Sequence, residues 1–446
     1  MVPIIIAVMT LAFVVAFLFP RLSVLLVWPV LFLYPQNYLF GFLPLNAGLD
    51  DIFILFVAAR FAMVQGLGAV SPSSRFVVVI AVLVLLMQLV TDLGSLFAHP
   101  YLISRVLKDL LKNIVLLAFA WTMVSAIRTD EDVRKHIIAF GLAASLAGMI
   151  VVLSLYFPAL TSAWEVRQRG LAYLEGTAGK RAFGPFNGPA EVAGFVCIVV
   201  PIAAGLLLQG RGSGRGVRLL AWAMVVIGTL SVLVSKTRSG LLGLAGMLVA
   251  ILFTSRQRWY VLGISLALAL VVGLAVLMAG GDVLQALEFR FSLESLSSDL
   301  ATRLTIWSRI VSSPSWQSFL LGEGVAPLAI RLNATPHNGY LDALFVWGPF
   351  GVFVFGTMFY CMLKWSRTVM KWHADPLSRG LGAGVLWSAI AVLTMAMTSD
   401  PWYMPYYKLA SFFMLALMAA SYAAVTEPSA EAQWEMDLEA SHLALD

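Results

Sequence analysis

The sequence predicts an all-α integral membrane protein, a polytopic bundle of about 12 (12–13) transmembrane helices. Of the 446 residues, 60% are hydrophobic and only 12% are charged, whereas about a quarter of an ordinary soluble chain is charged. The apolar residues form runs long enough to cross a hydrocarbon layer about 30 Å thick. Several connections between these runs are rich in Lys and Arg, as is typical of cytoplasmic loops.

The apolar runs follow one another from the N-terminus to residue 425. The first run lacks a basic segment and a small-residue cleavage site, so we interpret it as a retained membrane segment and not as a signal peptide. The second run is short, and one of the early runs can equally be re-entrant. The expected spans are 2–19, 22–34, 49–65, 76–97, 108–127, 136–157, 190–208, 219–235, 240–254, 259–278, 337–363, 380–397 and 409–425.

The Lys/Arg-rich connections fix the predicted orientation of the second half. Residues 209–218, 255–258 and 364–379 should lie in the cytoplasm by the positive-inside rule. The connections that alternate with them should then lie on the outer side, and the largest of these is the segment between the spans near 259–278 and 337–363. The expected outer segments are 158–189, 235–240, 279–336 and 398–408.

Composition excludes several other classes of protein. Cys197 and Cys361 lie far apart inside apolar runs, which argues against a disulfide framework and against a cysteine metal site. His and carboxylate residues form no cluster at ligand spacing, so we predict no metal and no cofactor. The net charge of +5 comes from scattered basic residues without a single block, so nucleic acid is not an expected partner.

Two outer segments carry cations where topology disfavours them: Arg181 in the first, and Lys236 and Arg238 in the turn 235–240. As a helix, residues 240–254 cover only about 22 Å of a layer about 30 Å thick, so this turn should lie below the outer surface. A cation there costs about 2.5–3.5 kcal/mol, which favours an anionic partner. An alternative is that these side chains extend to lipid headgroups.

His337 stands where the chain enters the next span. "TPHN" at 335–338 predicts a helix start with Thr335 as N-cap and His337 in the first turn. The helix would run inward from the outer face, so its N-terminal dipole should attract anions and disfavour imidazolium. A neutral imidazole beside an anion site suits a general base. The alternative is that His337 contacts only water or a loop carbonyl.

Five motifs follow in order on the outer side: "KRAFGPFN", "SKTRSGLLGL", "RLTIWSR", "LLGEG" and "HNGYLDALFVWGPFG". In the last motif, His337 is followed by ten residues and then by Gly348. Through these motifs, roughly residues 170–400 resemble the O-antigen ligase and polysaccharide polymerase superfamily of bacterial inner membranes.

The resemblance implies a glycosyltransferase of this type, acting in lipopolysaccharide or exopolysaccharide biosynthesis in the cell envelope. Its donor would be an undecaprenyl-pyrophosphate-linked glycan, and its acceptor a hydroxyl on a glycan or on the lipid A core; membrane lipids would surround it. The protein would be multi-pass in the inner membrane, with its active site facing the periplasm. Residues 1–157 would then be N-terminal transmembrane helices, 158–425 a catalytic transmembrane region with periplasmic loops 158–189 and 279–336, and 426–446 an acidic, disordered cytoplasmic tail.

Displacing pyrophosphate from an anomeric carbon requires stabilisation of the leaving group and deprotonation of the acceptor. His337 is the candidate base. Because guanidinium binds phosphate through a bidentate fork, Arg238 is the first candidate for a pyrophosphate clamp, followed by Arg181 and Arg303. Attack on one face and departure from the other would make the transfer inverting and metal-independent. Further candidates for substrate binding are Arg290, Arg309, Lys236, Asn338 and Glu191, the last also as a second acid or a partner of Arg181.

Two other functions remain open. Asp50 and Asp51 in "NAGLDDIF" could serve a metal-dependent polyprenyl-phosphate-sugar glycosyltransferase, or could simply cap the third span. A lipid-linked glycan flippase or transporter would be expected to place ionisable groups near the bilayer midplane and to contain repeats. Within the resemblance itself, ligase and polymerase differ in their acceptor, and both remain open.

Overall fold

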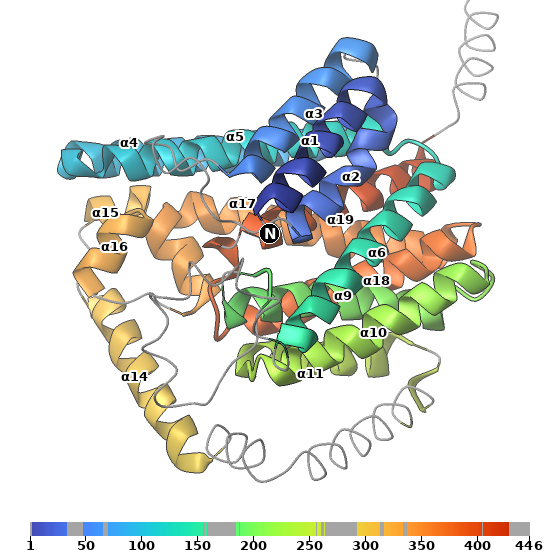
Figure 1. Ribbon diagram of the computed structural model, residues 1–446. Helices are drawn as coiled ribbons and strands as arrows, with labels where there is room; N and C mark the ends of the chain where they lie inside the picture. Colours follow the sequence, from blue (N-terminus) through green and yellow to red (C-terminus); the bar gives the residue numbers. More distant parts are fainter. Residues whose placement is uncertain are drawn as a thin grey trace, which may run out of the picture.

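The computed structural model describes residues 2–33, 48–65, 70–154, 157, 184–186, 188–255, 257–259, 263, 292–312, 316–332, 337–403 and 405–427. Within these ranges every regular element is a helix, which confirms the all-α prediction (Figure 1). The predicted loop 158–189 and the tail 426–446 lie almost wholly outside the described residues.

The helices of the bundle are α1 (Val2–Leu18), α2 (Pro20–Leu33), α3 (Leu49–Gln65), α4 (Pro72–Ala98), α5 (Ile103–Ala126), α6 (Asp130–Ser154), α9 (Pro189–Leu208), α10 (Arg215–Val234), α11 (Arg238–Thr254), α17 (Gly339–Trp372), α18 (Pro376–Ala396) and α19 (Pro405–Thr426). Three more helices precede α17: α14 (Leu293–Ser312), α15 (Trp316–Leu321) and α16 (Val325–Leu332). Short 3₁₀ turns lie at Pro100–Leu102 and Pro401–Tyr403.

The helices identify a multi-pass membrane protein. In the described part of the chain, eight helices are long and apolar enough to span a bilayer, and α1, α2 and α11 are shorter apolar helices. Every expected span except 259–278 coincides with a helix, and that one lies almost entirely outside the described residues. The expected count of 12–13 spans is therefore not confirmed.

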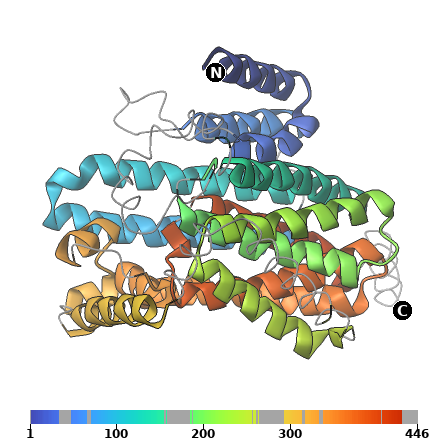
Figure 2. The same ribbon diagram turned by 60° about the horizontal axis from the view of Figure 1, so that its bottom comes forward.

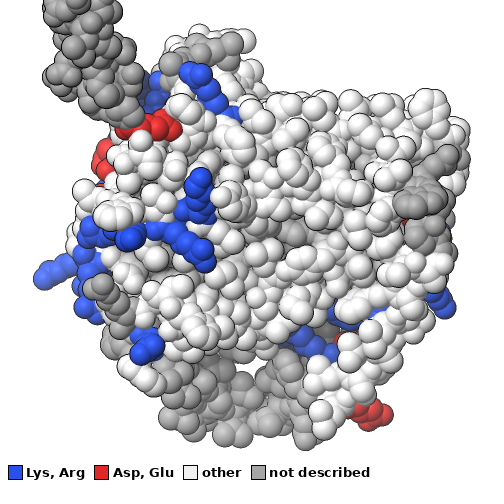
Figure 3. Space-filling view, turned by 180° about the vertical axis from the view of Figure 1, so that it is seen from behind, with Lys and Arg blue, Asp and Glu red and all other residues white. Residues whose placement is uncertain are grey.

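The bundle helices lie side by side, with α1 at the periphery (Figure 2). At one end the basic connections meet: Arg211 donates to the side chain of Gln257 at 3.1 Å, and the His373 imidazole lies 3.4 Å from the Asp130 carboxylate. Figure 3 shows more Lys and Arg toward one end of this face and a smaller group at the opposite lower end, with a broad area of other residues between them. The orientation predicted by the positive-inside rule stays a prediction.

Glycine brings α9 and α18 into direct backbone contact. A Cβ atom on Gly205 would lie 2.3 Å from the carbonyl oxygen of Gly380 and 2.3 Å from the amide nitrogen of Gly384. Such an approach is possible only without a side chain, as in other small-residue contacts between membrane helices. Because α9 also packs against α10 and α11, this pair forms the centre of the second half of the bundle.

The turn between α15 and α16 enters the bundle at a kink in α17. Gly348 has φ 67° and ψ −170°, and Pro349 has no N–H to donate to the carbonyl of Phe345. In its place, the N–H of Glu323 donates to Phe345 O at 2.8 Å, and the N–H of Gly324 donates to Val346 O at 3.1 Å. The turn thus satisfies carbonyls that the kink releases.

The same turn is held from the other side by α4. The hydroxyl of Ser95 donates to the carbonyl of Glu323 at 3.2 Å, and that of Thr91 donates to the carbonyl of Leu321 at 3.4 Å. Both α4 and α17 are candidate spans. Part of the segment 279–336, which is predicted to lie on the outer side, thus packs between α4 and α17, because a kinked helix offers buried carbonyls that need donors.

Candidate active site

Arg238 is the first residue of α11 and is largely buried, with 17% of its side chain exposed. Its Nη1 contacts the Asp299 carboxylate at 2.5 Å, and its Nη2 donates to the hydroxyl of Ser295 at 2.7 Å. Both partners belong to α14. The position of Arg238 in a short turn predicted an anionic partner, and in the structure Asp299 is such a partner.

The turn that carries Arg238 is fixed against the start of α9. The hydroxyl of Thr237 donates to Pro189 O at 3.1 Å and lies 2.7 Å from the hydroxyl of Ser235. Lys236, in a left-handed conformation with φ 52°, is also buried. The two cations of this turn are therefore held in place by neighbouring elements and do not both extend to the surface.

Ser295, Asp299 and Arg303 recur every fourth residue of α14 and so lie on one side of it, which we call the inner face of α14. The guanidinium of Arg303 donates to the carbonyl of Thr398 at 2.7 Å, just after α18. Figure 1 shows α14 crossing one end of the bundle instead of running along it. The inner face of α14 thus contacts the ends of two different helices.

His337 lies just outside α17. The N-cap of this helix is Asn338 and not the expected Thr335, so His337 is not in the first turn; it takes a left-handed conformation with φ 51°. Its Nδ1 lies 3.2 Å from the carboxylate of Asp400, which is almost fully buried, whereas about half of the imidazole is exposed. The tautomer that donates from Nδ1 leaves Nε2 as the proton acceptor.

Asn338 holds the start of α17. Its side-chain oxygen accepts from the N–H groups of Tyr340 at 3.0 Å and Leu341 at 3.1 Å, and its Nδ2 donates to the carbonyl of Met397 at 3.4 Å. Two N–H groups that the helix could have offered to an anion are therefore used by this cap. Asn is a strong N-cap, so it prevails over the Thr-Pro pattern upstream.

A chain of contacts joins these groups. Asp299 and Arg303 are separated by about 6 Å along the axis of α14. Asp299 contacts Arg238, and Arg303 contacts Thr398, which lies close in sequence to the partner of His337, Asp400. Of the candidates, Arg238, Arg303, His337 and Asn338 are thus linked through α14 and the segment 397–400.

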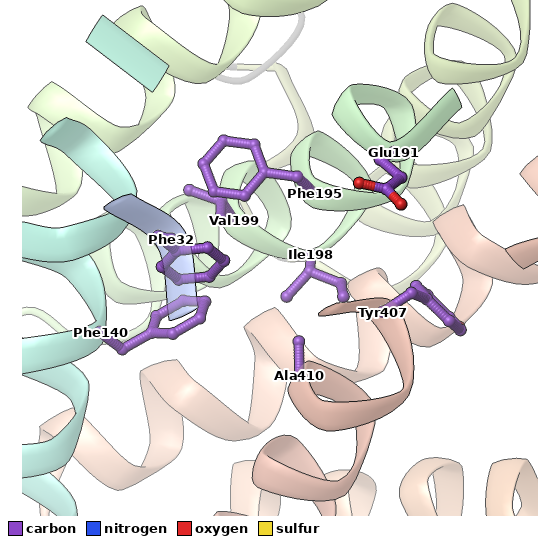
Figure 4. Close-up of a pocket in the computed structure, with 8 residues that line it drawn as sticks. All are labelled: Phe32, Phe140, Glu191, Phe195, Ile198, Val199, Tyr407 and Ala410. Carbon is purple, nitrogen blue, oxygen red and sulfur yellow. The ribbon is translucent and has the colours of Figure 1, made fainter. Parts of the chain in front are cut away.

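The other candidates lie apart from these contacts or outside the described residues. Arg309 is exposed in the last turn of α14, where its carbonyl accepts from Arg331 at 3.4 Å. Glu191 lies at one end of an apolar cavity between α2, α6, α9 and α19 (Figure 4). Arg181 and Arg290 lie outside the described residues.

Asp50 and Asp51 are buried at the start of α3. The Asp51 carboxylate contacts the Lys112 ammonium at 2.5 Å and accepts the Gly48 N–H at 2.9 Å. That second contact gives Asp51 the capping role that the sequence had offered as an alternative. No group of three or more His, Cys, Asp or Glu side chains able to hold a metal occurs among the described residues.

Sequence reasoning missed the carboxylates that partner the candidate residues. Asp299 had a readable signal, because the spacing of Ser295, Asp299 and Arg303 marks one polar helix face. Asp400 had no such signal in the sequence, since only the folded structure brings it close to His337. A further buried chain was also missed: Trp347 donates to Gln88 at 2.9 Å, and Gln88 donates to Asp92 at 2.8 Å, which fixes α17 next to its kink.

Residues 222–356 match the family model described as "O-Antigen ligase". The matched segment includes α11, α14 and the start of α17, and therefore Arg238, Arg303 and His337; Asp400, Glu191, Asp50 and Asp51 lie outside it. No curated protein matches the chain. The family match covers less than half of the chain, and it confirms the resemblance indicated by the motifs.

Proposed function

Since residues 222–356 match the O-antigen ligase family, we propose that this membrane protein transfers a glycan from an undecaprenyl-pyrophosphate carrier to an acceptor hydroxyl. The transfer would take place at the periplasmic face of the bacterial inner membrane. The observation that carries the proposal is the His337–Asp400 pair, joined through α14 to Arg238. An oriented base and a guanidinium are the two groups that this reaction requires.

In this proposal His337 activates the acceptor. Nε2 takes the proton of the acceptor hydroxyl while its oxygen attacks the anomeric carbon of the donor. The Asp400 carboxylate receives the Nδ1–H hydrogen bond and stabilises the imidazolium that forms. The bond from the anomeric carbon to the pyrophosphate oxygen breaks, and the leaving group keeps the electron pair. Attack and departure on opposite faces invert the anomeric configuration.

Arg238 binds the departing pyrophosphate. The guanidinium fork binds carboxylate and phosphate groups in the same way. In this structure the Asp299 carboxylate therefore takes the place on Arg238 that a phosphate oxygen of the donor would take. Because 45% of the Asp299 side chain is exposed, a ligand arriving from outside can reach this pair. The positive charge of Arg238 stabilises the leaving pyrophosphate, as a divalent metal ion does in many phosphate enzymes, so the scheme requires no metal.

The remaining candidates have supporting roles in the proposal. Arg303 and Lys236 add positive charge beside Arg238, and Asn338 fixes the start of α17 next to His337. Arg181, Arg290 and Arg309 are assigned to the donor glycan or its phosphates. Glu191 is assigned to the carrier side, because it borders an apolar cavity.

The test uses purified protein with an undecaprenyl-pyrophosphate glycan and, in turn, a second glycan or a lipid A core as acceptor. We expect product with one acceptor, in the presence of EDTA, with inverted anomeric configuration. Product formation by donor and acceptor in the same leaflet separates a transferase from a flippase. Activity that is lost on chelation but retained by His337→Ala would contradict the proposal and favour a metal-dependent reaction through Asp50 and Asp51.

A further inference from the structure

The exposed surface of α14 is divided into an apolar side and a polar side. Successive residues of a helix are rotated by about 100°, so residues 293, 296, 300, 304 and 311 fall on one stripe beside the inner face. We call it the leucine stripe; its members are exposed: Leu293, Leu296, Leu300, Leu304 and Val311. Small polar residues form the opposite side, among them Ser298, Thr302 and Thr305, which are also exposed.

We propose that the leucine stripe lies in the outer leaflet of the membrane that the bundle spans, so that α14 is an interfacial helix. A row of exposed large apolar side chains is unfavourable in water by about 25 cal/mol for each Å² of apolar surface. A helix with one apolar and one hydroxyl-rich side suits the boundary between hydrocarbon and water. Figure 1 shows that α14 crosses the end of the bundle, as an interfacial helix would.

The contacts of the inner face set the height of α14 in the membrane. Asp299 contacts Arg238 at the start of the apolar helix α11, and Arg303 contacts Thr398 just after the span α18. Both contacts lie at helix ends, where lipid headgroups meet the protein. One turn into α11, the side chain of Leu242 is exposed and belongs to the lipid-facing surface of the bundle. In this proposal, Leu242 and the leucine stripe both face the outer leaflet.

An interfacial α14 holds Asp299 and Arg303 at the level of the lipid headgroups, which is also the level of any phosphate on a lipid carrier. The inference itself concerns only where the leucine stripe lies, so it does not depend on the proposed function.

The test compares the two sides of one helix. Single cysteines replace Leu300 or Leu304 on the leucine stripe and, as matched controls, Ser298 or Thr305 on the polar side. Each is labelled with an environment-sensitive fluorophore; Cys197 and Cys361 are buried and should remain unlabelled. The proteins are reconstituted in phosphatidylethanolamine–phosphatidylglycerol vesicles with normal or brominated acyl chains. We expect brominated lipid to reduce emission by about twofold or more at 300 and 304, and little at 298 and 305.

Aqueous iodide provides the complementary measurement and should quench the labels at 298 and 305 more strongly. Equal lipid quenching on both sides, or strong iodide quenching at 300 and 304, would overturn the inference. Labels at 300 and 304 that neither quencher reaches would also overturn it, because a second protein surface would then cover the stripe. None of these readouts requires transfer activity, so a failure here is distinct from a failure of the proposed reaction.

Discussion

The imidazole of His337 and the carboxylate of Asp400 come from different segments and act as one unit in the proposed reaction. Replacing His337 by Ala removes the base and should lower the transfer rate by roughly 10²–10⁴-fold. Asp400→Asn keeps a hydrogen-bond acceptor for Nδ1 but removes the negative charge, so its decrease should be smaller. Single-turnover assays of the purified variants measure both effects.

Ser297→Ala is a suitable control for that pair, because Ser297 is exposed on α14 and should leave the rate unchanged. The variants should also insert into the membrane as the parent protein does. If Asp400→Asn transferred at the parental rate while His337→Ala were inactive, Asp400 would have no part in orienting the base.

The contact between Arg238 and Asp299 leads to a second prediction. If Arg238 binds pyrophosphate, the Asp299 carboxylate competes with the donor, and Asp299→Asn should lower the donor KM. An ion pair with a half-exposed partner is worth about 1 kcal/mol or less, so the decrease should be at most about fivefold. Steady-state kinetics at varied donor concentration measures it.

Arg238→Ala is the matched comparison, because it should abolish transfer and donor binding. A higher KM in Asp299→Asn would mean that the carboxylate positions Arg238 and does not compete for it. Ser295→Ala, which removes only the neutral partner of Arg238, should change the KM less than Asp299→Asn.

For individual residues, the sequence allowed Arg238 and His337 to be predicted, but not the carboxylates that contact them. Arg238 could be predicted because it is a charged residue in a short turn between apolar runs. His337 could be predicted because it directly precedes a predicted span. Asp400 follows the next span, so its contact with His337 depends on how α17 and α18 pack. No local pattern encodes that packing.

The helix α17 shows how far local patterns determine an element. Its apolar run and "WGPFG" motif were visible in the sequence, but the pattern of Thr335 and Pro336 favoured too early a start. The side chain of Asn338 caps the helix further along. The "LLGEG" motif gave no sign that its amides would donate to α17, because that pairing exists only when both segments are folded.

The kink of α17 should be intolerant of any side chain. Gly348 has φ 67° and ψ −170°, a region essentially restricted to glycine, and a Cβ there would lie 2.6 Å from Leu320 O. Gly348→Ala should therefore destabilise the protein by about 1–3 kcal/mol and displace the α15–α16 turn. Thermal unfolding in detergent measures the change.

Gly356 provides the control on the same helix. A Cβ on this residue would have no neighbour within 4 Å, so Gly356→Ala should be neutral or stabilise by about 0.5–1 kcal/mol. Equal stability of the two variants would mean that the kink is not the strained position described here.

For the whole molecule, hydropathy predicted nearly every helix because backbone groups in lipid must be satisfied within each segment. It could not give the position of α14 or the entry of the α15–α16 turn, since these depend on contacts between distant segments. The number of spans was also beyond hydropathy, because short apolar helices such as α2 and α11 can be counted either way.

The orientation of the bundle is testable with one reagent. In sealed, right-side-out membranes, a membrane-impermeant maleimide should label Ser298→Cys on α14 but not Gly216→Cys in the basic end of α10, although both positions are exposed. The prediction follows from the positive-inside rule applied to the Lys/Arg-rich connections. The reverse pattern would invert the topology and place the candidate site in the cytoplasm.

In the proposed reaction, the glycine contact between α9 and α18 limits the routes by which a lipid-anchored sugar could arrive. Backbones that touch at Gly205, Gly380 and Gly384 leave no width for an isoprenoid tail, and sliding one helix past the other would drive carbonyls into each other. A carrier that reaches the candidate site would therefore enter between other helices, and the α9–α18 contact would stay closed.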